Sequence, residues 1–364
     1  MSGTSLDGVD AVLANFDPVG KPSVLARAAS EFDPRLRETL FSLNTSGPDE
    51  LARAALAANS LVALYAKLVA QTLKQAKLLP SQISAIGAHG QTVRHQPSLG
   101  YTIQLNAPAL LAELTGITVV ADFRSRDVAA GGQGAPLVPV FHAGIFSTDH
   151  PRVILNLGGI ANITILRPGA DPVGFDTGPA NALMDSWCQL HTQQSFDADG
   201  AWGAQGRVNQ ALLERLNNAE PWLKLAPPKS TGRDLFNLEW LEPRLQYCLG
   251  RLAPEQHLTP QDVQATLCAF TAATAAQAIN TYAPDAQDVL LCGGGARNSA
   301  LRQSLQASLA CVVSTTESVG VGTQDVEALA FAWLAWAHQQ GLPAGNPKVT
   351  GARGARILGA TWPA

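Results

Sequence analysis

One residue whose type and position could do chemistry is Asp176. It stands in Gly174–Pro179, which we interpret as a sharp turn leading into a helix with Pro179 in its first turn. An ionised carboxylate there can act as a general base, taking a proton from a water molecule within hydrogen-bond reach. The alternative role is a helix N-cap, for which aspartate is well suited.

Three glycine-rich turns are candidate phosphate-binding sites. They lie at 3–8, 157–162 and 293–298. Backbone N–H groups in such turns bind phosphate oxygens, because glycine lets the backbone approach closely. One such turn is usually an ordinary tight turn, but three, with Gly-Gly-Gly opening a helix, favour a nucleotide. None has the spacing of a P-loop or of a dinucleotide-binding fingerprint, which disfavours both of those classes.

Composition limits the classes of function. The chain has 364 residues, of which 46% are hydrophobic and 15% charged, and a net charge of −4. We therefore expect about two domains, and neither nucleic acid nor a membrane as a partner. No uninterrupted apolar run is long enough to span a bilayer, and no signal peptide is visible. The five cysteines include no C-x-x-C pair, which favours buried, reduced thiols in a cytosolic protein.

Strands and helices alternate along the chain, which predicts an α/β fold. Residues 9–16, apolar on both faces, predict a central strand. The glycines at 131–134 are interpreted as a domain hinge. The other predicted strands are 24–32, 83–88, 101–105, 117–121, the hairpin 152–156 with 160–166, and 288–292, and the predicted helices are 49–79, 108–114, 260–282 and 324–340.

Several segments together resemble the anhydro-N-acetylmuramic acid kinases, a family of the sugar kinase/Hsp70/actin superfamily. They are Met1–Asp10 and the segments 87–92, 121–136, 156–162, 174–179, 230–233, 292–298 and 327–331. The similarity runs along the whole chain. It implies two actin-like (ribonuclease H-like) domains around a nucleotide cleft, one formed by 1–130 with 345–364 and the other by 131–344.

The resemblance also implies the reaction. These kinases use ATP to open the 1,6-anhydro ring of anhydro-N-acetylmuramic acid and phosphorylate O6, giving N-acetylmuramic acid 6-phosphate and ADP. Water adds at C1, and Asp176 takes its proton. The family implies Mg²⁺, a homodimer and a cytoplasmic role in peptidoglycan recycling. Because O6 leaves to the γ-phosphoryl group, a second carboxylic acid of the kind that glycosidases use is not required.

Site residues follow from the same motifs. Asp7 and Asp10 are candidate Mg²⁺ ligands, because Mg²⁺ takes few carboxylates plus phosphate oxygens; a turn role for Asp7 and a solvated role for Asp10 are the alternatives. The candidate ATP-binding residues are Gly3, Thr4, Ser5, Leu6, Asp7, Gly8, Val9, Asp10, Gly158, Gly159, Asn162, Gly293, Gly294, Gly295 and Asn298.

Sugar recognition needs fixed donors and acceptors, and arginine can bind the lactyl carboxylate bidentately. The alternatives are a surface ion pair for the arginines and a solvated helix face for Glu327. His89 and His95 lack metal-ligand spacing, so a zinc site is not predicted. Arg233 has no assigned role. The candidate sugar-binding residues are His89, Gln91, Thr92, Arg124, Arg126, Asp127 and Glu327.

Two rival functions use the same features. One is an ATP-independent glycoside hydrolase, which would need a second carboxyl group beside the sugar. The other is a non-catalytic actin-like module that binds nucleotide, which leaves Asp176 without a task. The family's signature normally follows a short apolar strand, whereas here it opens the sequence. Because the other motifs are intact, we expect a longer natural protein rather than an impaired form.

Overall fold

The chain forms two compact units in a computed structural model that describes residues 1–3, 6, 8–233, 235–251 and 257–364. The first unit is Met1–Phe146 with Asp325–Ala364, and the second is Ser147–Gln324. These boundaries differ from 130 and 344, because helices α5 (Val138–Phe146) and α11 (Val326–Gln339) pack together inside the first unit. The glycines at 131–134 consequently lie within the first unit, away from both crossings between the units.

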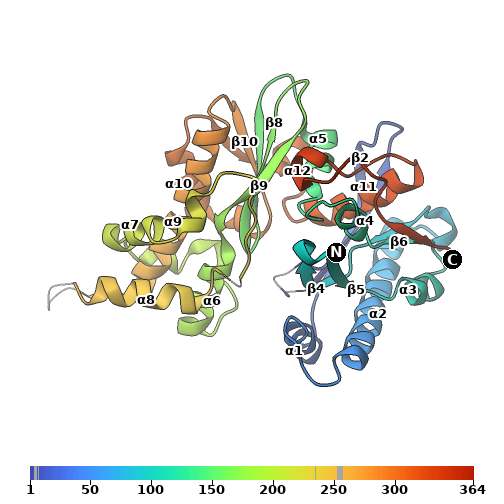
Figure 1. Cartoon of the computed structure of the whole chain (residues 1–364), viewed down its shortest axis with the longest axis horizontal. Coiled ribbons are helices and arrows are strands. Elements are labelled where there is room, and N and C mark those ends of the chain that lie inside the picture. The colour runs from blue at the N-terminus through green and yellow to red at the C-terminus, as the bar shows by residue number, and fades with distance from the viewer. Residues whose placement is uncertain (4–5, 7, 234, 252–256) are drawn as a thin grey trace. The chain divides into compact units, whose positions relative to one another are not determined.

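Three small sheets, β1-β2, β12-β6-β3 and β4-β5, and a long helix form the core of the first unit (Figure 1). Helix α2, drawn in blue, buries Leu61, Val62 and Leu68 among residues of the neighbouring elements. By length and composition alone it could also cross a membrane, a test that the core helix of a soluble protein passes as well. The elements are β1 Gly8–Phe16, β2 Pro22–Glu31, α1 Pro34–Ser42, α2 Glu50–Ala76, β3 Ile86–Ala88, β4 Gln91–Gln96, β5 Tyr101–Leu105, α3 Pro108–Thr115, β6 Val119–Ala121, α4 Ser125–Ala129, α5, α11, α12 Pro347–Thr350 and β12 Ala360–Trp362.

Strand β1 is not the central strand that its apolar faces predicted. Among the described residues it pairs only with β2, and β3 lies at the edge of the sheet β12-β6-β3. A cavity of about 590 Å³ is lined by β1, β3, α2 and α11. At one end of β1, the Met1 amine donates to the Asp10 carbonyl at 2.7 Å, and the Asp10 N–H donates to the Met1 carbonyl at 2.9 Å. Burial lowers the pKa of this amine to about 6.

One five-stranded sheet, ordered β11-β10-β7-β8-β9, organises the second unit (Figure 1). Strands β7 and β10 are parallel, so the glycine turns that follow them emerge at the same edge. Strand β9 runs in the same direction, since β8 is antiparallel to both β7 and β9. The elements are β7 Arg152–Leu157, β8 Ile160–Leu166, β9 Val173–Pro179, α6 Asn181–Thr192, α7 Gln210–Asn218, α8 Leu238–Leu249, α9 Pro260–Tyr282, β10 Asp288–Cys292, α10 Ser299–Ser308 and β11 Val312–Thr315.

The predicted α/β alternation is confirmed, and helix 260–282 and strand 288–292 have the predicted bounds. All five cysteines are free thiols, four buried and Cys311 half-buried. The segment Gly174–Pro179 is different from its prediction. It forms β9, and helix α6 begins only at Asn181, after Ala180. The chain continues the ladder with β8 through Pro179, which forms the end of the strand.

Candidate active site

The glycine turns after β7 and β10 touch each other inside the second unit. A Cβ atom on Gly293 would lie 2.5 Å from Oδ1 of Asn156, and one on Gly295 would lie 2.8 Å from Cβ of Leu157. Gly293 also has a φ of +81°, a conformation that side chains disfavour. These two positions accept only glycine, and they bring the turn after β10 against the end of β7 within this unit.

The start of helix α6 fixes the hairpin turn at Gly158–Gly159. The Asn181 N–H donates to the Gly158 carbonyl at 3.0 Å, and the Ala180 and Ala182 N–H groups donate to the Gly159 carbonyl at 3.0 Å. In a trans peptide the C=O and N–H point in opposite directions, so the N–H of Gly159 points away from α6. A rigid turn with an outward N–H suits an anion such as phosphate.

Asp176 lies on strand β9, directly opposite Asn162 on β8. It is therefore not the helix N-cap considered from the sequence. The Thr231 N–H donates to its Oδ2 at 2.9 Å, and its own N–H donates to the Lys229 carbonyl at 3.1 Å. Burial raises the pKa of this carboxyl to about 6, against the opposing effects of the Thr231 N–H and the Lys229 charge. Asp176 is thus held by the backbone of Lys229 and Thr231, and burial moves its pKa upward toward neutrality.

Lys229 supports this carboxylate and was missed from the sequence. Its ammonium donates to the Leu223 carbonyl at 2.9 Å and lies 4.5 Å from the centroid of the Trp222 ring. Burial lowers the pKa of Lys229, and the charge of Asp176 opposes that change. The only sequence signal was its position, one residue before the motif 230–233.

Asn298 has a structural role in this arrangement. Its Oδ1 accepts a hydrogen bond from the Leu301 N–H at 3.0 Å, which caps the N-terminus of helix α10. The side-chain carbonyl is therefore already used by the fold. Binding of ATP by Asn298 stays a prediction, as does binding by Asn162, which is partly buried in β8.

In the first unit, the predicted sugar-binding residues His89 and Gln91 contact the backbone of Ser2 and Gly3. The carbonyl of Ser2 lies 3.1 Å from Nδ1 of His89, and Nε2 of Gln91 donates to the Gly3 carbonyl at 3.1 Å. Ser2 Oγ donates to the Gly90 carbonyl at 3.0 Å. The Oε1 atom of Gln91 is buried and has no hydrogen-bond partner among the described residues. The candidates Thr4, Ser5 and Asp7 lie outside the described residues, whereas Leu6, Gly8, Val9 and Asp10 lie within them.

His89 also orients Arg124. Nε and Nη2 of Arg124 each lie 3.1 Å from Nε2 of His89, and Nη1 donates to the Gly134 carbonyl at 2.8 Å. Burial and the Arg124 charge lower the pKa of His89 well below its usual value, so the imidazole is neutral and its Nε2 accepts. Burial lowers the pKa of Arg124 to about 10, and Glu327 on α11 opposes this change electrostatically.

The remaining sugar candidates separate into buried and exposed residues. Asp127 is 1% exposed, and its carboxylate accepts from the Gly134 N–H at 2.8 Å and from Oγ1 of Thr350 at 2.8 Å. It fastens the glycine loop at 131–134 and is buried in doing so. Arg126 is exposed on helix α4. Oγ1 of Thr92 accepts from Nε2 of Gln104 at 3.2 Å.

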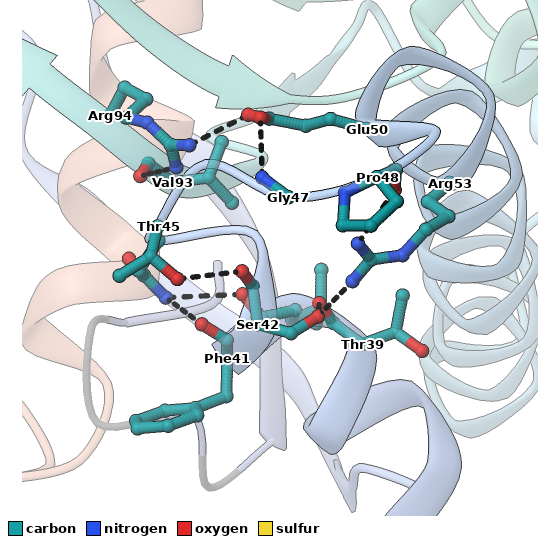
Figure 2. A network of polar contacts seen from close by, with 12 residues as sticks. Thr39, Phe41, Ser42, Thr45, Gly47, Pro48, Glu50, Arg53, Val93 and Arg94 are labelled. Atoms are coloured by element: carbon teal, nitrogen blue, oxygen red, sulfur yellow. Dashed lines mark hydrogen bonds and ion pairs between the residues drawn. The ribbon is translucent and has the colours of Figure 1, made fainter.

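A polar network ties strand β4, which carries Gln91 and Thr92, to the start of helix α2 (Figure 2). Nη2 of Arg94 pairs with Oε1 of Glu50 at 2.7 Å, and Arg53 donates to Oγ of Ser42 and to the carbonyl of Pro48. Both termini of the α1–α2 connection are bonded in this way. Because β4 begins at Gln91, its link to helix α2 also supports the segment 89–91.

The described residues contain no cluster of three or more histidine, cysteine or acidic side chains that would hold a metal. Asp10, one of the two candidate Mg²⁺ ligands, is exposed near the start of β1. A single carboxylate suits Mg²⁺, which relies largely on phosphate oxygens and water.

Comparison with known proteins assigns the family. The family model described as anhydro-N-acetylmuramic acid kinase matches residues 1–364. This chain belongs to the anhydro-N-acetylmuramic acid kinase family. The kinase of that name from Bordetella parapertussis is 62% identical over 364 residues, covering 100% of this chain and 95% of that protein. The one from Burkholderia mallei is 52% identical over 380 residues, covering 100% and 96%.

Solved structures give a much weaker likeness. Component A of (R)-2-hydroxyglutaryl-CoA dehydratase from Acidaminococcus fermentans matches 89% of this chain and 96% of its own, at 13% identity and a TM-score of 0.43. A score this low supports no statement about this chain. The family membership rests on the sequence relatives, and it confirms the resemblance found in the motifs.

Proposed function

We propose that this enzyme catalyses the reaction after which its family is named: it is an anhydro-N-acetylmuramic acid kinase. It transfers the γ-phosphoryl group of ATP to O6 of the sugar while water opens the 1,6-anhydro ring. Asp176 accepts a proton from water, the water oxygen bonds to C1, and the C1–O6 bond breaks. O6 then bonds to the γ-phosphorus as the bond to ADP breaks, so the leaving oxygen is captured as a phosphate ester.

The observation that carries this proposal is the placement of Asp176. A general base works best when its pKa lies near the working pH, and burial raises the pKa of Asp176 to about 6. The carboxylate lies on β9, whose direction brings its carboxyl end to the same sheet edge as the two glycine turns. A base and a phosphate-binding turn at one edge are what coupled hydration and phosphoryl transfer require.

We assign the nucleotide phosphates to the glycine turns of the second unit, and we propose that Mg²⁺ bound with them neutralises phosphate charge. In the first unit we propose Arg124 and Glu327 as sugar-binding residues, because arginine can bind a carboxylate with two donors and the charge of Glu327 acts on the Arg124 guanidinium. His89 and Asp127 are then positioning residues. A homodimer and a cytoplasmic place in peptidoglycan recycling are part of the proposal.

The test is sugar-dependent release of ADP, measured together with formation of the sugar phosphate. Asp176→Asn keeps the side-chain size but removes the base, and it should reduce turnover by at least a hundredfold. Asp171→Asn, an exposed residue between β8 and β9, is the matched control and should keep wild-type turnover. Sugar consumption without ATP would instead establish a hydrolase, and ATP binding without sugar-stimulated turnover would establish a nucleotide-binding module.

A further inference from the structure

The segment 229–233 connects two parts of the proposed site, and its arginine has no role in the reaction described so far. At one end of the segment, the Lys229 carbonyl and the Thr231 N–H hold Asp176. At the other end, a Cβ atom on Gly159 would lie 3.5 Å from Nε and 3.6 Å from Nη2 of Arg233. The guanidinium group therefore covers the Gly158–Gly159 turn while the same short segment fixes the carboxylate.

The position of Arg233 is set by the fold on both sides. Nδ2 of Asn237 donates to the Arg233 carbonyl at 3.1 Å, and Oδ1 of Asn237 caps helix α8. The Phe236 N–H donates to the Gly232 carbonyl at 3.1 Å, and Phe236 is fully buried. Before the arginine, Nε1 of Trp222 donates to the Ser230 carbonyl at 3.0 Å. The backbone that carries the guanidinium is thus anchored upstream and downstream.

The guanidinium itself is available. Arg233 is exposed, and within the described part of the chain it forms no ion pair. Two other arginines of this unit form ion pairs: Arg152 pairs with Asp288 at 2.6 Å, and Arg167 pairs with Asp285 at 2.7 Å. An anchored cation beside a turn whose Gly159 N–H points outward is matched to an anion with several oxygens, and arginine binds such groups with two parallel N–H donors.

We propose that Arg233 binds the transferring phosphate of the nucleotide at the Gly158–Gly159 turn. The segment 229–233 then fixes the phosphate and the base relative to one another, so that the water attacking C1 is activated where the leaving oxygen meets the phosphorus. The proposal rests on the kinase function proposed above. It gives the motif 230–233 a task that its sequence did not reveal.

Binding and turnover test the proposal separately. A non-hydrolysable ATP analogue and adenosine are titrated calorimetrically into the wild-type protein and into Arg233→Ala, Arg233→Lys and Arg251→Ala. Arg251 is exposed at the other end of helix α8, where it stacks on Tyr247 at 3.6 Å, so its removal changes net charge equally. Adenosine lacks phosphate, so its affinity reports whether the fold and the part of the site that binds adenosine are intact.

Arg233→Ala should lower the affinity for the analogue by about tenfold to a hundredfold, as loss of a charged hydrogen bond does, and leave the affinity for adenosine unchanged. The affinity of Arg233→Lys for the analogue should lie between those of Arg233→Ala and the wild type, and that of Arg251→Ala should match the wild type. Turnover of Arg233→Ala should fall about a hundredfold. Equal affinity of Arg233→Ala and the wild type for the analogue, or no binding of the analogue by the wild type, would overturn the proposal. If the wild type binds the analogue but releases no sugar-dependent ADP, the kinase proposal fails while the binding comparison still decides the role of Arg233.

Discussion

Asp176→Asn is expected to make the protein more stable at pH 8 while it abolishes turnover. Burial raises the pKa of Asp176 from 3.8 to about 6. At pH 8 the ionised carboxylate is therefore less favourable in the folded protein than in the unfolded chain, and it lowers the free energy of unfolding. The difference of roughly two pKa units corresponds to about 3 kcal/mol at 1.36 kcal/mol per unit. Asparagine keeps an oxygen that accepts from the Thr231 N–H but carries no charge to be desolvated.

The size of this effect depends on pH. Because the folded pKa is raised, the unfavourable contribution is fully present above about pH 6 and is absent below about pH 3.8, where both states are protonated. The gain from Asp176→Asn should therefore be largest at pH 8 and shrink as the pH falls through 6. For a unit of 150–250 residues, about 3 kcal/mol corresponds to roughly 6–12 °C in the unfolding midpoint.

The assay is thermal unfolding of the wild type, Asp176→Asn and the control Asp171→Asn at pH 8 and at pH 4.5. Comparing variants at each pH cancels the other titrating groups, since all three chains share them. The reasoning is refuted if Asp176→Asn is no more stable than the wild type at pH 8, or if its advantage is the same at both pH values. Asp171→Asn should track the wild type throughout.

Three further predictions follow from contacts of single residues. Thr231→Pro removes the N–H that stabilises the Asp176 carboxylate and should shift the acid limb of the pH–turnover profile to higher pH. Thr231→Ala keeps the N–H and should leave the limb in place. Equal profiles for the two variants would contradict this. Asp127→Ala should destabilise the first unit by about 2–4 kcal/mol in urea unfolding, because the Gly134 N–H and the Thr350 hydroxyl lose a buried acceptor. Six apolar residues placed before Met1 should continue the pairing begun with Asp10, fill the cavity beside β1 and raise the unfolding midpoint, whereas six Gly/Ser residues should raise it little.

The α/β class, the strongly periodic helices and the glycine turns were predictable because their signals are local. Helix 260–282 carries its own start signal in Thr259 and Pro260, and the hairpin at 152–166 carries its turn. The family motifs were visible for a similar reason. A phosphate-binding turn needs glycine in a fixed order, so its sequence records its geometry.

Asp176 shows where local signals end. Its neighbours Gly178 and Pro179 are typical of a turn, yet the segment forms a strand because β8 offers a ladder to pair with. The two residues that hold Asp176, Lys229 through its carbonyl and Thr231 through its N–H, lie more than fifty residues later in the chain. No spacing in the sequence indicates which loop will cover a given strand.

The sequence by itself determined the fold class and the glycine turns, and its resemblance to the family predicted Asp176 as the base. Only the tertiary structure decided which polar residues remain available for ligands. His89 and Asp127 were candidates because of their type, but burial commits them to Arg124 and to the 131–134 loop. The reason is that burying a polar group is unfavourable unless it is hydrogen-bonded, and its partners come from distant segments that meet only in the folded chain.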